Sequence, residues 1–167
     1  MVWLPPLLDA LPESFFLILH FPVDVKVLCD RGKMFPWLKP LRCPRCGGVR
    51  LWGHGFSARY FEGFSESLLV KRFRCPDCRA VHTCKPLGFL KGFRYPDEVI
   101  HASLWEKITE NCWIKGVCRQ NQQYWYRCLR KWASRLENVK LPSSAHLELF
   151  LSARIFSVTE YFAPLRI

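Results

Sequence analysis

The chain of 167 residues is poor in acidic side chains and has no long apolar run. Asp and Glu number 14 against 25 Lys and Arg, so the formal net charge is +11 at pH 7. No apolar stretch approaches the roughly 20 residues that a membrane-spanning helix needs. The N-terminus has no basic residue before its first apolar segment, although a secretion signal would carry one. We therefore expect a soluble cytoplasmic protein.

The sequence also lacks the local signatures of common catalytic sites. It has no glycine-rich phosphate loop, no His-Glu-x-x-His motif and no recognisable series of Ser, His and Asp. The five histidines are scattered along the chain. These absences predict that the protein is not an enzyme.

The excess positive charge is confined to one stretch. All of it lies between Arg42 and Arg135, and outside this stretch basic and acidic residues are equal in number. A charge excess of this kind is typical of proteins that contact a polyanion, with nucleic acid ahead of anionic membrane. The alternative is a solvated basic surface without a specific partner.

Four of the nine cysteines form two Cys-Pro-x-Cys pairs, Cys43 with Cys46 and Cys75 with Cys78. Disulfides are rare in a reducing compartment, so metal ligands are the better interpretation. Each pair can form a knuckle, a tight turn that directs two sulfurs at one point, and two knuckles give a tetrahedral thiolate site that suits Zn²⁺. Such a site has no open coordination position and is therefore structural.

Some features of the cysteine pattern leave alternatives open. The interval between the pairs exceeds the roughly 15–20 residues of common four-cysteine sites, and the second pair is followed by Arg79 rather than glycine. His54, His82 and Cys84 are possible replacement ligands, although the last two fit a strand after the second knuckle. The remaining cysteines are expected to be core thiols: Cys29, Cys112, Cys118 and Cys128.

The chain divides into four segments that together predict an α+β fold, a small β-rich zinc ribbon followed by a helix-turn-helix bundle. Residues 1–41 form a Pro-rich arm with strands expected at 15–19 and 23–27. Residues 42–95 form the ribbon, with strands expected at 51–55, 58–61 and 68–74. Residues 96–140 form the helical segment, and 141–167 form a tail. The tail is expected to be amphipathic over 145–161 and to pack on the Pro-rich arm.

Helical periodicity predicts three helices, over 97–109, 113–119 and 122–137. The third has an apolar stripe formed by Trp125, Cys128, Leu129, Trp132 and Leu136. A short helix, a tight turn and a longer basic helix are typical of a helix-turn-helix, whose last helix reads the major groove. A packed helical hairpin without a DNA-binding role is the alternative.

The opposite face of the third helix carries side chains that can pair with base edges or hold phosphates. Arginines beside the knuckles can also reach phosphates, or can simply offset the charge of a zinc thiolate site. The candidate DNA-binding residues are Gln122, Gln123, Tyr126, Arg127, Arg130, Lys131, Arg45, Arg72 and Arg74.

The cysteine pairs, His54-Gly55, the basic run from Lys71 to Arg74 and the helical segment together resemble the N-terminal region of bacterial insertion-sequence transposases. They are also similar to small stand-alone zinc-ribbon proteins related to these enzymes. The resemblance covers about residues 42–137. It implies a bacterial, nucleoid-associated protein that binds duplex DNA, with Cys43, Cys46, Cys75 and Cys78 as zinc ligands.

The sequence departs from a full transposase because it has no room for the three-carboxylate, two-metal domain of those enzymes. The last Asp is Asp97, and only Glu148 and Glu160 follow Leu141. We therefore expect a regulatory or accessory DNA-binding protein, alone or within a larger nucleoprotein complex. The alternative is a protein–protein adaptor that uses the ribbon and the apolar ends of the chain to join a larger complex, with nucleic acid secondary; the apolar face of the tail supports it. An RNA-binding ribbon is a third reading, with Trp52, Tyr60, Phe61 and Phe73 as stacking residues.

Overall fold

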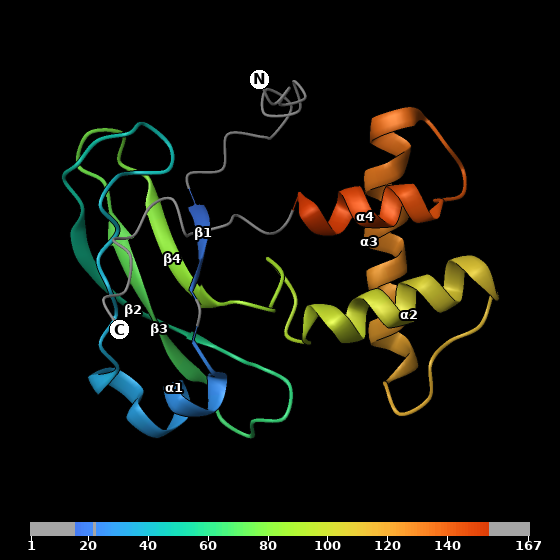
Figure 1. The fold of residues 1–167 in the computed structure, drawn as a ribbon, viewed down its shortest axis with the longest axis horizontal. Coiled ribbons are helices and arrows are strands. Elements are labelled where there is room, and N and C mark those ends of the chain that lie inside the picture. The colour runs from blue at the N-terminus through green and yellow to red at the C-terminus, as the bar shows by residue number, and fades with distance from the viewer. Residues whose placement is uncertain (1–15, 22, 154–167) are drawn as a thin grey trace.

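The computed structural model describes residues 16–21 and 23–153, and shows a β-sheet beside a group of helices (Figure 1). The sheet and helix α1 (Val25–Arg31) form one side of the molecule. Helices α2 (Asp97–Thr109), α3 (Arg119–Glu137) and α4 (Ser144–Ser152) form the other. The four strands are thus segregated from α2, α3 and α4, which confirms the predicted α+β class.

The sheet has four strands in the order β1-β4-β3-β2. Strands β2 (Trp52–Arg59), β3 (Leu68–Arg74) and β4 (Val81–Pro86) form an antiparallel meander, and β1 (Phe16–Phe21) pairs with β4 in parallel. The strand predicted at 68–74 is confirmed by β3, and the described part of the strand predicted at 15–19 is confirmed by β1, which extends to Phe21. Those predicted at 51–55 and 58–61 are a single strand, in which Gly55 adopts φ +70° within an irregular register.

The strand predicted over 23–27 is wrong, because these residues begin helix α1. The side chain of Asp24 accepts a hydrogen bond from the Lys26 N–H at 2.8 Å and so caps the helix. Val25 and Leu28 are buried one helical turn apart, whereas Val27 is exposed. The alternation of apolar and polar residues that predicted a strand is therefore also compatible with a short helix that buries one face.

An apolar cluster holds α1 against the sheet. Its central contact is between Phe61 and Phe89, whose ring centroids lie 5.0 Å apart in an edge-to-face arrangement. The buried members of this cluster are Val25, Leu28, Phe61, Leu68, Val70 and Phe89. Residues of the N-terminal arm thus complete a core that the ribbon segment supplies only in part.

The helical side has its own core. Helix α2 begins and ends as predicted, with Pro96 before it and two acidic residues in its first turn. The shared core of α2, α3 and α4 consists of Leu90, Phe93, Tyr95, Ile100, Leu104, Trp125, Leu129, Leu147, Phe150 and Leu151. None of the helices within residues 23–153 is long and apolar enough to cross a membrane.

The short helix predicted over 113–119 is absent from the structure, and α3 begins earlier than expected, at Arg119. An irregular loop joins α2 to α3, with Asn111 at φ 56° and Gly116 at φ 79°. These left-handed residues turn the chain in place of a helix. The helix-turn-helix geometry expected from the sequence is therefore corrected to two helices joined by a longer loop.

Helix α4 lies in the predicted amphipathic tail but packs on α2 and α3, which corrects the expectation that the tail packs on the Pro-rich arm. The Ser143 side chain and His146 form a reciprocal cap at its start. Leu147, Phe150 and Leu151 then enter the helical core. The rest of the predicted segment, 154–161, and the first prolines of the arm lie outside the described residues.

Candidate functional site

The four paired cysteines meet at one end of the sheet. The first knuckle, residues 43–48, precedes β2, and the second knuckle, residues 75–80, joins β3 to β4. In the first, the Gly47 N–H donates to the Cys43 carbonyl at 2.8 Å, and Gly47 adopts φ 73°. Arg79 occupies the corresponding place in the second at φ 61°. The glycine missing from the second pair is thus replaced by a left-handed arginine.

The sulfur atoms are arranged for one ion. All four lie within 4.8 Å of one another, and the Cys43–Cys78 and Cys46–Cys75 sulfur pairs are 3.6 Å apart. Bonds of about 2.3 Å to a tetrahedral ion would place sulfurs about 3.8 Å apart. The four predicted ligands therefore form a cluster that can hold a metal ion. His54, His82 and Cys84 lie outside that cluster.

Burial controls the protonation of this cluster. Desolvation raises the pKa of the Cys43 thiol to about 12 and also raises that of Cys78. A hydrogen bond from the Gly48 backbone N–H lowers the pKa of Cys46. Without a cation, the thiols of Cys43 and Cys78 keep their protons at neutral pH. Binding of a divalent ion must therefore release protons from the site.

His82 supports the cluster without belonging to it. Its Nε2 lies 3.2 Å from the Cys43 sulfur, and the side chain is buried on β4, the strand on which the sequence placed it together with Cys84. Burial lowers the pKa of His82 to about 4, so the imidazole is neutral. A neutral imidazole with its proton on Nε2 donates to this sulfur and orients it.

Three of the four remaining cysteines differ from the prediction that they are core thiols, and the fourth agrees with it in part. Cys29, Cys112 and Cys118 are exposed, and Cys128 is half-buried on α3. Cys128 packs against the shared core of α2, α3 and α4. None of these four belongs to the metal-binding cluster found among the described residues.

Charged groups around the knuckles are partly paired. Arg50 forms an ion pair with Asp77, which lies within the second knuckle. Of the three candidate DNA-binding residues near the knuckles, Arg45 and Arg74 are exposed and Arg72 is half-buried. Arg45 lies within the first knuckle, and Arg74 ends β3 directly before the second. They therefore add positive charge beside the thiolate cluster.

Helix α3 has two distinct faces. Trp125, Leu129 and Ala133 are buried against the other helices. The opposite face exposes most of the predicted DNA-binding side chains, namely Gln123, Arg127, Arg130 and Lys131. Tyr126 is half-buried, with its ring edge-on to Trp113 at a centroid distance of 6.0 Å. Tyr126 therefore contacts the loop before α3 and is only partly exposed to solvent.

Gln122 does not fit the prediction that it contacts DNA. Its side chain is only 1% exposed, and its carbonyl accepts hydrogen bonds from Ser103 at 2.7 Å and from the Ile114 N–H at 3.1 Å. Its amide donates to the Ile114 and Val117 carbonyls at 3.0 and 2.9 Å. Gln122 is a clamp that fastens the loop to α2 and α3. A helical wheel could not reveal this, because the partners lie on other elements.

The C-terminal half of α3 borders a basic groove with a volume of about 470 Å³. The groove is lined by Arg127, Arg130, Lys131, Ser134, Asn138, Val139 and Lys140. No acidic side chain is among these described lining residues. Sequence reasoning missed Asn138 and Lys140, although a basic residue just beyond a helix end is a signal that could have found them. The groove can receive an anion such as a phosphate group.

Comparisons with known proteins do not assign the chain to a family. No protein-family model matches it, and searches of curated proteins and of solved structures find no significant match.

Proposed function

We propose that the chain is a zinc-stabilised, non-catalytic DNA-binding protein, related to transposases and acting as a regulatory or accessory factor on duplex DNA. The observation that carries this proposal is the exposed basic face of α3, which continues into the basic groove. A polyanion that follows this face meets several cations and no acidic lining group. Duplex DNA is the polyanion whose regular phosphate spacing such a helix fits.

Zinc is the ion that the four-sulfur cluster fits best. Four thiolates in tetrahedral arrangement suit Zn²⁺, and an oxygen-preferring ion such as Mg²⁺ would not select them. With four protein ligands, the ion has no position for a substrate. Its contribution is to hold the two knuckles together, and the chain's own residues make the contacts with DNA.

The α3 face suggests a division of roles. Arg127, Arg130 and Lys131 lie at or beside the groove and are suited to phosphates. Gln123, near the N-terminal end of α3, is suited to a base edge in the major groove. Because the preceding short helix is replaced by a loop, the first contacts of a helix-turn-helix with the backbone would come from loop residues instead.

The adaptor alternative loses its main support in the described residues. It relied on an apolar tail that needs a partner, but Leu147, Phe150 and Leu151 are buried against α2 and α3. A strongly basic face is a poor surface for a generic protein partner, because charged residues are depleted at the core of protein–protein interfaces.

The proposal is tested by duplex binding at several salt concentrations. We expect the logarithm of the association constant to fall by about 0.9 per logarithm of salt for each phosphate contacted. Replacing Arg127 and Arg130 together by Ala should weaken binding about tenfold and reduce the salt slope by about two. The matched control is Lys26→Ala with Lys33→Ala, which removes the same charge from α1 and the turn after it.

Equal losses from both double variants would contradict the proposal, since they would show attraction by net charge alone. Absence of zinc from the purified protein, measured by elemental analysis, would contradict the part of the proposal that concerns the metal.

A further inference from the structure

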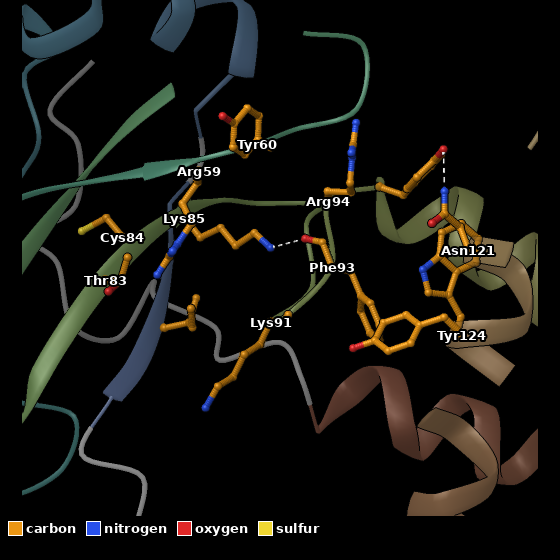
Figure 2. Close-up of a pocket in the computed structure, with 14 residues that line it drawn as sticks. Arg59, Tyr60, Thr83, Cys84, Lys85, Lys91, Phe93, Arg94, Asn121 and Tyr124 are labelled. Carbon is orange, nitrogen blue, oxygen red and sulfur yellow. Dashed lines mark hydrogen bonds between the residues drawn. The ribbon is translucent and has the colours of Figure 1, made fainter. Parts of the chain in front are cut away.

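A second cavity lies between the sheet and the helices, apart from both the metal cluster and the basic groove. This cleft has a volume of about 540 Å³, within the roughly 300–1,000 Å³ range of small-molecule sites. Figure 2 shows Arg59, Tyr60 and Lys85 on its sheet side and Asn121 and Tyr124 on its helical side. None of the described residues that line it is acidic.

A buried cation projects into this cleft. The Lys85 side chain, on β4, is 7% exposed, and its Nζ donates to the carbonyls of Leu90 and Phe93, the latter at 2.7 Å (Figure 2). Within residues 16–21 and 23–153, no carboxylate forms an ion pair with it. Burial, and then the charge of Arg59, lower the pKa of Lys85 to about 8. The group is still mainly a cation at neutral pH.

More positive charge lies at the mouth of the cleft. Arg59 and Lys91 are exposed lining residues. Arg94 also lines it but forms an ion pair with Glu62 at 3.1 Å. Basic side chains gathered around a buried ammonium group make the electrostatic potential of the cleft positive. The cleft is therefore electrostatically suited to an anionic group from outside the chain.

Aromatic rings flank the same space. Tyr60, at the end of β2, is 62% exposed, and Tyr124, on α3, is 48% exposed. The Tyr124 ring packs edge-on against Phe93 with centroids 6.0 Å apart, which steadies it. Behind them, the Tyr95 hydroxyl accepts a hydrogen bond from the Asn121 amide at 3.1 Å. Exposed rings beside cations are the combination that holds a nucleobase and its phosphate.

We propose that this cleft binds one unpaired nucleotide of a DNA strand, with its phosphate near Arg59 and Lys85 and its base against Tyr60. The inference rests on the proposed function, because it takes the nucleotide to be part of the DNA that the α3 face holds. A base inside a duplex is stacked and cannot enter a concave site of this size, so the nucleotide must leave the stack. Inorganic phosphate has no base, so its binding would not explain the aromatic rings beside the cations.

The test measures binding of a fluorescent thymidine single strand of about ten nucleotides, a length comparable to the site sizes of known single-strand binding folds. A mixed-sequence duplex is measured in parallel. Tyr60→Ala should weaken single-strand binding about tenfold, while Tyr60→Phe should retain it because the ring remains. Arg59→Gln should weaken it similarly, and the control Lys33→Gln, on the turn after α1, should not.

The two proposals fail in different ways. Loss of single-strand affinity in Tyr60→Ala and Arg59→Gln, with duplex affinity unchanged, supports the cleft. If neither variant changes single-strand affinity, or if both weaken strand and duplex equally, the cleft inference is overturned. If wild-type protein binds no duplex but Tyr60→Ala still loses the single strand, the duplex function fails and the cleft remains.

A competition arm distinguishes the source of the nucleotide. Free thymidine monophosphate at millimolar concentration should compete weakly if the cleft takes a nucleotide within a strand. Competition at micromolar concentration, lost in Tyr60→Ala, would assign the cleft to a free nucleotide and overturn its assignment to DNA.

Discussion

The helical side of the molecule and the knuckle end of the sheet are stabilised by different interactions. The helices share a core of large apolar side chains, including Leu104, Leu129 and Phe150. At the knuckle end of the sheet the buried cluster consists of Cys43, Leu51 and Cys75, with Cys78 packed against them. One region thus resists unfolding through apolar burial, and the other has little to bury except its sulfurs. We therefore expect a bound metal ion to stabilise the knuckle end and to contribute little to the helical core.

The largest effect should come from breaking the sulfur cluster. Cys75→Ser should release the metal and unfold the knuckle end, because metal binding at such a site supplies folding free energy, on the order of 10 kcal/mol in zinc-finger peptides. Far-ultraviolet circular dichroism should retain the helical signal, while amide hydrogen exchange should increase in residues 42–86. Cys29→Ser, an exposed position on α1, is the control. Unfolding of the helices together with the knuckle end would contradict the view that the two regions are stabilised separately.

An intermediate effect is expected from the clamp at Gln122. Gln122→Ala removes four hydrogen bonds and leaves buried backbone groups of the loop unpaired, which should lower the free energy of unfolding by about 2–3 kcal/mol. Thermal unfolding should register this loss while zinc content stays constant. The adjacent Gln123→Ala, on the exposed face, should change stability by about 0.5 kcal/mol or less. Similar losses in both variants would mean that the clamp contributes little.

The smallest effect distinguishes the two knuckles. Arg79 has φ 61°, a conformation that costs a non-glycine residue about 1 kcal/mol, whereas the first knuckle has Gly47 at φ 73°. Arg79→Gly should therefore raise the free energy of unfolding by up to about 1 kcal/mol, reduced by the greater freedom of glycine in the unfolded chain. Chemical denaturation of the metal-bound protein measures this change in the free energy of unfolding. Destabilisation beyond 1 kcal/mol would show that the arginine side chain itself stabilises the turn.

Local signals in the sequence predicted the cysteine cluster and helix α2. Two residues of a knuckle lie within one turn, so their spacing already describes the geometry. Pro96 and the acids that follow it mark the start of α2 in the same local way. The alternation over 23–27 misled because it is also compatible with a short helix once Asp24 provides a cap.

Features that depend on distant partners could not be predicted. The apolar residues Ile114, Val117 and Cys118 suggested a helix over 113–119, but the structure has a loop there, which Gln122 of α3 holds by hydrogen bonds to the Ile114 and Val117 carbonyls. The apolar face of α4 was visible, but not that α2 and α3 would cover it. Likewise, Lys85 is an ordinary lysine in the sequence and becomes a buried cation only when β4 lies beside the segment containing Leu90 and Phe93.

The parallel pairing of β1 with β4 has a consequence for synthesis of the chain. Phe16 pairs with Val81 and Phe21 with Pro86, so β1 is synthesised well before its partner and cannot pair until β4 has emerged from the ribosome. The meander of β2, β3 and β4 involves shorter loops and can close before then. Until β1 docks, β4 presents an unprotected edge to other chains. Early contact between nascent copies therefore competes with completion of this sheet.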